Sequence, residues 1–305
     1  MYRPEVTVDE AIVEYLQTGR ADQMHPEWPG AGFFDRATRA EEGLHAALVA
    51  EVRRRSKGKG WGSRVDVPAD MAAFTRSLVE PMVRGLFSRS KHESILNLLE
   101  RSAVLVTDAN VEDIIRGAPS LSTGWNVANF YLVGVGAEAL GGTGSYAGFS
   151  TNLKCYVTPE YFEQKEPFVD FLIHECAHVL HDCKFERIEL RATRSRERLV
   201  ELEFRERETF AYSCEAFSSI AMGRSPSGRA ELAARFRSRK PYPRDAVDVE
   251  KVEQIVTEAA PLRNGWKRVL ERCAPTTPPK YRLYRKHRGV PRHHDGDPNS
   301  RDAAG

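Results

Sequence analysis

The sequence lacks the features that would link it to a membrane, an oxidising compartment or nucleic acid. No run of about eighteen apolar residues occurs, so we expect no membrane-spanning helix and no membrane partner. The five cysteines are odd in number and show no CxxC spacing, and the acidic N-terminus lacks the basic and apolar blocks of a signal peptide, so we expect a reducing, cytoplasmic location. The net charge is only +2, so no overall field attracts nucleic acid.

Composition and periodicity favour a folded, mainly helical protein. Hydrophobic residues make up 41% of the 305 residues and charged residues 29%, which leaves ample chain for a core. We predict an α+β fold that is predominantly helical, with a helical N-terminal region at 1–140 and a core at 141–273. The range 274–305 is rich in Pro, Arg, Lys and His, and we expect it to be a disordered basic tail.

Hydrophobic spacing and capping residues predict a series of helices with one short extended stretch. The stretch 145–157 combines glycine, serine and aromatic residues, which favours an edge strand or a short hairpin. The predicted helices are 6–17, 37–55, 66–87 with Asp66 as its cap, 91–101, 108–115, one from about 122, 166–183, 205–222, 229–237 and 247–273.

A metal-binding pattern, HECAH, begins at His174 and ends at His178. The surrounding range 166–183 is predicted to be a helix, because Pro167 suits its first turn and the apolar residues recur without a glycine. Residues four apart project from the same face of a helix, so the two imidazoles can bind one ion. Glu175 lies next to them.

The chemistry of this pattern is that of a catalytic zinc ion. Zinc bound by neutral imidazoles lowers the pKa of a water toward about 7, and an adjacent carboxylate such as Glu175 can accept the proton as that water attacks a carbonyl. The sequence therefore predicts Zn²⁺ as cofactor and the hydrolysis of an amide or a related bond. The alternative is that His174 and His178 are core histidines with hydrogen-bond partners of their own.

A catalytic zinc needs a third protein ligand, and the predicted helix 205–222 offers two candidates. Glu208, Tyr212 and Glu215 follow one another at spacings of four and three, so they form one polar stripe. Either Glu208 or Glu215 is able to reach an ion on the first helix.

Other polar residues beside the motif have simpler interpretations. Cys176 and Cys183 lie off the histidine stripe, so we do not expect them to bind the metal. His181 and Asp182 follow on the histidine stripe and are candidates to orient a ligand, but a solvated helix end is the favoured interpretation.

The HECAH motif, followed some thirty residues later by ETFA at 208–211, resembles the gluzincin branch of the zinc metallopeptidases. The resemblance covers roughly 146–222 and implies a zincin-like metallopeptidase core in 141–273 with a peptide or protein as substrate. It implies that His174, His178 and Glu208 bind the zinc and that Glu175 is the general base. The ETFA string is similar to the start of the ligand helix in lethal-factor-like members, which favours Glu208 over Glu215.

The sequence departs from this family at Tyr212. Many gluzincins have an acidic residue there, four positions after the ligand glutamate, where it supports a zinc histidine; in this chain Glu215 lies nearly a turn further on. Tyr212 is also a candidate to stabilise the oxyanion of the reaction, as are Tyr146, Tyr156 and Tyr161 from the preceding segment.

The extended stretch 145–157 suggests how a substrate would bind. An edge strand beside the active helix can pair with an extended peptide through its main chain. Two other classes stay open: a non-catalytic regulatory or adaptor protein with a structural or vestigial metal site, and a zinc hydrolase of a non-peptide amide or ester. Structural zinc sites usually have four protein ligands and favour cysteine, and no DNA-reading module is identifiable, so the sequence favours the peptidase.

Overall fold

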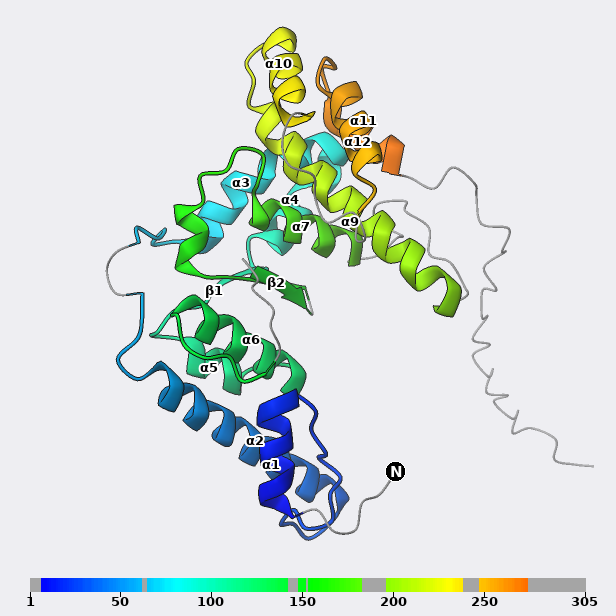
Figure 1. Cartoon of the computed structure of the whole chain (residues 1–305). Coiled ribbons are helices and arrows are strands. Elements are labelled where there is room, and N and C mark those ends of the chain that lie inside the picture. The colour runs from blue at the N-terminus through cyan, green and yellow to red at the C-terminus, as the bar shows by residue number, and fades with distance from the viewer. Residues whose placement is uncertain are drawn as a thin grey trace, which may run out of the picture.

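The part of the chain that the structure describes is mostly helical, with one small sheet near its middle (Figure 1). The structure is a computed structural model that describes residues 7–61, 65–141, 148–151, 153–182, 196–237 and 247–273. The predicted α+β class with predominant helix is confirmed. The predicted tail at 274–305 lies outside the described residues. Of the described helices, none combines the length and the apolar character that a bilayer-crossing segment requires.

Helices occur along the whole of the described chain, both before and after the strands. The α-helices are α1 (Val8–Thr18), α2 (Phe33–Ser56), α3 (Met71–Leu86), α4 (Arg89–Leu99), α5 (Val111–Arg116), α6 (Leu121–Gly134), α7 (Phe171–Asp182), α9 (Arg196–Ala221), α10 (Pro226–Arg237), α11 (Val249–Ala259) and α12 (Gly265–Cys273), and η1 (Pro159–Glu163) is a 3₁₀-helix.

The sheet has three strands in the order β1-β3-β2. β1 (Ala103–Leu105) pairs in parallel with β3 (Lys154–Val157), and β2 (Gly148–Thr151) forms an antiparallel hairpin with β3. The predicted hairpin at 145–157 is therefore confirmed for its described residues.

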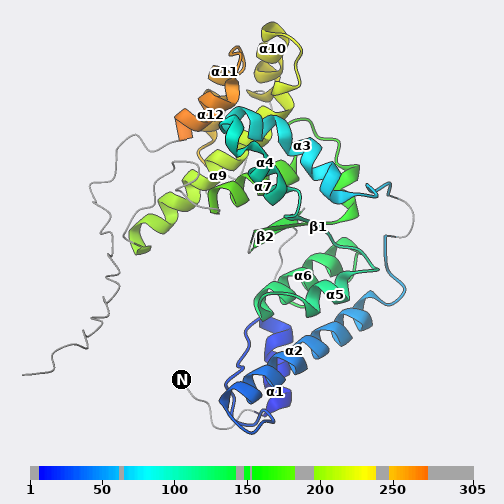
Figure 2. The ribbon, with the colours of Figure 1, turned by 180° about the vertical axis from the view of Figure 1, so that it is seen from behind.

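Each face of the sheet packs on a different hydrophobic core, because alternate side chains of a strand leave opposite faces. Ala103, Leu105, Cys155 and Val157 belong to one core, and Val104, Phe149 and Tyr156 belong to the other. The first core, termed the upper core, contains side chains of α3, α4, α7 and α9 to α12. The second, the lower core, contains side chains of α1, α2, α5 and α6. Figures 1 and 2 show the sheet between these two groups of helices.

The N-terminal range 1–140 contributes helices to both cores. α1, α2, α5 and α6 surround the lower core, whereas α3 and α4 pack on the C-terminal helices in the upper core. The chain therefore crosses from the lower core to the upper core and back before it reaches residue 140.

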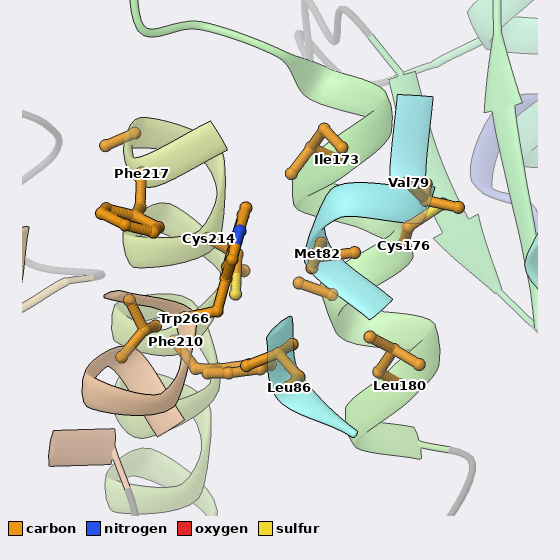
Figure 3. Close-up of a cluster of buried hydrophobic side chains, with 14 of the residues drawn as sticks. Val79, Met82, Leu86, Ile173, Cys176, Leu180, Phe210, Cys214, Phe217 and Trp266 are labelled. Atoms are coloured by element: carbon orange, nitrogen blue, oxygen red, sulfur yellow. The ribbon is translucent and has the colours of Figure 1, made fainter. Parts of the chain in front are cut away.

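The helix α7 lies in the middle of the upper core. Its apolar side presents Ile173, Cys176 and Leu180, which are all buried, to neighbouring helices and to the sheet (Figure 3). Side chains of α3, α9 and α12 complete this part of the core: Val79, Met82, Leu86, Phe210, Cys214, Phe217 and Trp266. A helix held by α3, α9 and the sheet is a rigid base for functional side chains on its remaining face.

The predicted start of this helix is wrong. The pattern suggested a first turn at Pro167, but α7 begins at Phe171, because the Asp170 side chain accepts a hydrogen bond from the Ile173 amide at 3.1 Å and so caps the helix. Phe168 has a positive φ of 68°, which breaks any helix there. Its ring is buried against Phe236, and this packing holds the unusual backbone in place.

Three further features of the structure differ from the predictions. The cap of α3 is Asp70 instead of Asp66, since the Asp70 carboxylate accepts from the Ala73 amide at 2.9 Å. The strand β1 was not predicted, because three apolar residues carry too little pattern to distinguish a strand. The predicted single helix 247–273 is two helices. The second begins at Gly265, where a side chain would collide with α9, because a Cβ at this position would lie 2.2 Å from Phe217 Cζ.

Candidate metal centre

The polar faces of α7 and α9 meet and run antiparallel to each other. Asp170 and His174, near the start of α7, contact Glu215, whereas His178, one turn later, contacts Glu208, which precedes Glu215 on α9. At a rise of 1.5 Å per residue, the stretch from Asp170 to His178 and the stretch from Glu208 to Glu215 have nearly equal lengths. The polar side chains of the two helices therefore remain opposite each other. This arrangement brings residues some thirty positions apart in the chain into one site.

His174, His178 and Glu208 form a group whose ligand atoms all lie within 4.8 Å of one another. His174 Nε2 is 3.0 Å from His178 Nε2 and 3.5 Å from one Glu208 oxygen, and His178 Nε2 is 3.3 Å from the other oxygen. Two ligand atoms of a tetrahedral zinc ion with bonds of about 2.0–2.1 Å are roughly 3.3 Å apart. The donor set and its spacing therefore fit a zinc ion with two imidazole ligands and one carboxylate ligand.

The other candidate ligand, Glu215, bonds the far side of the same imidazole. One Glu215 oxygen lies 3.3 Å from His174 Nδ1, which faces away from His178 and Glu208. The other oxygen accepts a hydrogen bond from the Asp170 amide at 3.0 Å. Within the described part of the chain, Glu208 is thus the glutamate grouped with both Nε2 atoms, and Glu215 is a partner of the supporting nitrogen.

The ionisation of His174 and Glu208 reflects their mutual attraction. Burial favours neutral His174, but hydrogen bonds to Glu208 and Glu215 outweigh it and raise the His174 pKa to about 10. Burial likewise opposes the charge of Glu208, whereas the bonds from His174 and His178 lower the Glu208 pKa to about 2. A metal ion needs neutral imidazoles, so a proton and a metal compete for this site.

Glu175 is buried, and its charge acts on Cys155 in β3. Among the described residues its carboxylate has no hydrogen-bond or ion-pair partner, although only 7% of the residue is exposed. A hydrogen bond between the Cys155 and Cys176 thiols, then burial, then the charges of Cys176 and Glu175, raise the pKa of Cys155 in β3 well above its ordinary value. An unpaired carboxylate beside His174 is suited to accept a proton.

The tyrosines proposed from the sequence occupy different places. The Tyr212 ring lies 4.4 Å from the His174 ring in an edge-to-face arrangement, so it borders the site. The Tyr161 hydroxyl donates to Asp170 at 2.9 Å, and Tyr156 stacks on Phe149 in the lower core, across the sheet from α7. Tyr146 lies outside the described residues.

The remaining sequence candidates contribute nothing to this group of ligand atoms in the described structure. Cys176 is buried, and its thiol is within hydrogen-bond reach of Ser102 and Cys155 on the side toward β3. Cys183 and the side chains of His181 and Asp182 lie outside the described residues.

One residue at the site, Asp170, was missed by the sequence reasoning, and another, Tyr161, was proposed for the oxyanion but contacts the cap of α7 instead. Asp170 caps α7 with its side chain and donates its amide to Glu215, and Tyr161 donates to the Asp170 carboxylate. Burial raises the pKa of Asp170, and burial followed by the charge of Asp170 raises that of Tyr161. A signal for the first was present, because Asp is a preferred cap and stands immediately before the periodic apolar run. The contact of Tyr161 with Asp170 had no local signal.

Comparison of the chain with protein-family models, with curated proteins and with solved structures gave no match.

The stability of the metal-free protein is expected to fall as the pH rises from about 7 to 10. The His174 pKa is about 10 in the folded state and near 6.5 when unfolded, so the protonated imidazole contributes stability that is complete below pH 6.5 and lost through pH 10. The loss should be of the order of a few kcal/mol. Urea unfolding at pH 6.5, 8 and 10 with a chelator present measures it, and a His174→Gln variant should show a flatter profile. An equally steep profile in that variant would contradict the assignment.

Proposed function

We propose that the protein is a zinc-dependent metallopeptidase of gluzincin-like type, in which His174, His178 and Glu208 bind one zinc ion. The observation that carries the proposal is the spacing of 3.0 to 3.5 Å among the three pairs of ligand atoms. The neighbour of His174 in the chain, Glu175, is buried and has no hydrogen-bond partner among the described residues. His₂Glu is a ligand set of catalytic zinc, which keeps one position for water or substrate. Structural sites commonly use four protein ligands instead.

When bound, a zinc ion supplies Lewis acidity, which lowers the pKa of a water toward about 7 and polarises a carbonyl oxygen. Glu175 accepts the proton of the attacking water and later donates it to the leaving amine. Glu215 keeps the His174 ring oriented through Nδ1, so that Nε2 points toward Glu208. Tyr212, next to the His174 ring, is the described tyrosine best placed to assist at the oxyanion.

The arrangement of the sheet supports a peptide as the substrate and a zincin-like core as the scaffold. β2 is the outermost strand on the side that carries the hairpin, and α7 packs against both β2 and β3. Gly148 and Ser150 pair with Val157 and Cys155, which face the upper core, so the small residues of β2 are turned toward α7. An extended peptide that pairs with the edge of β2 left without a partner strand in the described part of the chain would run alongside the metal helix.

The proposal is tested by metal analysis together with a substrate screen on the full chain. We expect about one zinc ion per chain after dialysis, and cleavage of a mixed peptide library detected by mass spectrometry. The chelator 1,10-phenanthroline should abolish cleavage and added zinc should restore it, while the non-chelating 1,7-isomer serves as the matched control.

The same screen separates the alternatives. Cleavage of small amides or esters without cleavage of peptides would identify a hydrolase of non-peptide substrates. Stoichiometric zinc without turnover of any substrate would identify a binding protein. Absence of zinc would remove the proposal.

A further inference from the structure

We propose that Glu215 is a positioning residue that couples metal binding to the folding of the first turn of α7, an inference that rests on the proposed metal site. Its two carboxylate oxygens have different partners: one faces His174 Nδ1 at 3.3 Å and the other accepts the Asp170 amide at 3.0 Å. One buried side chain thus holds both a ligand imidazole and the backbone at the start of the helix that carries it.

Both partners of Glu215 are hydrogen-bond donors, which only a carboxylate can satisfy together. The backbone N–H of Asp170 can only donate a hydrogen bond. A His174 ring that binds a metal through Nε2 must carry its proton on Nδ1, so this nitrogen also donates. A glutamine at position 215 has a single acceptor oxygen, and its amide nitrogen would face one of the two donors.

The start of α7 is the part of the helix most dependent on side chains. The first amides of a helix have no partner within the helix, and in α7 they are served by the carboxylates of Asp170 and Glu215. The Asp170 carboxylate is in turn fixed by the Tyr161 hydroxyl at 2.9 Å. Because Glu215 is only 4% exposed, water does not readily replace either of its bonds.

The consequence is a reciprocal coupling between two sites on α7. A zinc ion that fixes His174 also fixes Glu215, and through it the Asp170 amide; conversely, an ordered first turn presents His174 in the orientation for binding. The position of this acid is specific to the chain, since it lies seven residues after Glu208, where the helix again faces α7, and Tyr212 occupies the position four residues after Glu208.

The test compares the full-length chain with Glu215→Gln by two measurements. Competition with a fluorescent zinc chelator gives the zinc affinity, and hydrogen exchange of the Asp170 amide is followed with and without zinc. We expect the variant to bind zinc about 10–100-fold more weakly. In the original protein zinc should slow exchange of this amide by about 5–150-fold, and the variant should lose most of that slowing.

Glu206→Gln provides the matched control, because it makes the same chemical change at an exposed position of α9. It should leave both measurements unchanged. A merely structural role of Glu215 would lower the free energy of unfolding and leave the zinc affinity of the folded protein as it was. If Glu215→Gln does not fold, Glu215→Asp is measured by the same criteria, because its shorter side chain keeps two acceptors but cannot reach both donors.

The outcomes separate this inference from the proposed function. The coupling would be overturned, and the metal site left intact, if Glu215→Gln keeps both its zinc affinity and its zinc-dependent slowing of exchange within about twofold of the original protein. Failure of the original protein to bind zinc at all would overturn the proposed function, and the coupling with it.

Discussion

Replacing Glu175 with glutamine is expected to reduce peptide hydrolysis by about 10²–10⁴-fold, the usual contribution of a general base, while zinc binding is kept. The amide is nearly the same size as the carboxylate but cannot accept the proton of the attacking water. Glu175 is not in the group of ligand atoms formed by His174, His178 and Glu208, so its replacement leaves the metal ligands in place. The measurement is kcat/KM on a peptide identified in the substrate screen, with zinc content determined on the same sample.

Glu166→Gln is the control for this change, since Glu166 is exposed and precedes the helix by five residues. It should behave as the original protein. Retained activity in a zinc-replete Glu175→Gln variant would show that another group accepts the proton, and the peptidase mechanism would have to be abandoned.

Replacing Glu208 with alanine is expected to weaken zinc binding by more than about 100-fold, which exceeds the effect of losing a residue that only supports a ligand. The change removes one of the three proposed metal ligands and leaves two histidines, with Nε2 atoms 3.0 Å apart, without the carboxylate that faces both of these atoms. Activity should fall with the zinc content. Elemental analysis after dialysis against a weak chelator, followed by titration with zinc, measures both the content and the affinity.

The Glu208 variant is best compared with two others. Glu206→Ala, two residues earlier on α9 and exposed, should bind zinc normally. Glu215→Ala should weaken zinc binding less than Glu208→Ala does, because Glu215 contacts His174 through Nδ1. The reverse order would make Glu215 the third ligand and would require α9 to rotate relative to α7.

The grouping of His174, His178 and Glu208 could be anticipated because it depends on local rules. Two histidines four residues apart share a face in any helix, and α9 repeats its polar residues at helical spacing. The choice between Glu208 and Glu215 could not be made from spacing alone, because it depends on how α7 and α9 are aligned. The antiparallel contact between these helices decides which glutamate meets the Nε2 atoms.

Features that depend on contacts between residues far apart in the chain could not be predicted from the sequence. The start of α7 was placed too early, because the burial of Phe168 against Phe236 imposes a left-handed backbone that no local pattern signals. The strand β1 is defined by its pairing with β3, some fifty residues later. The contact of Tyr161 with Asp170 likewise joins two elements, η1 and the cap of α7, that sequence periodicity treats separately.

The sheet that divides the upper core from the lower core also limits how the chain can be dissected. β1 and α3 come from the first 105 residues, whereas their neighbours β3 and α7 follow residue 150. A fragment cut near residue 140 would leave β3 with one bare edge and would expose the apolar face of α7 that α3 now covers, and such surfaces favour aggregation. The helices before the motif are therefore part of the scaffold that supports HECAH, and the half of the chain that carries the motif cannot be obtained by simple excision.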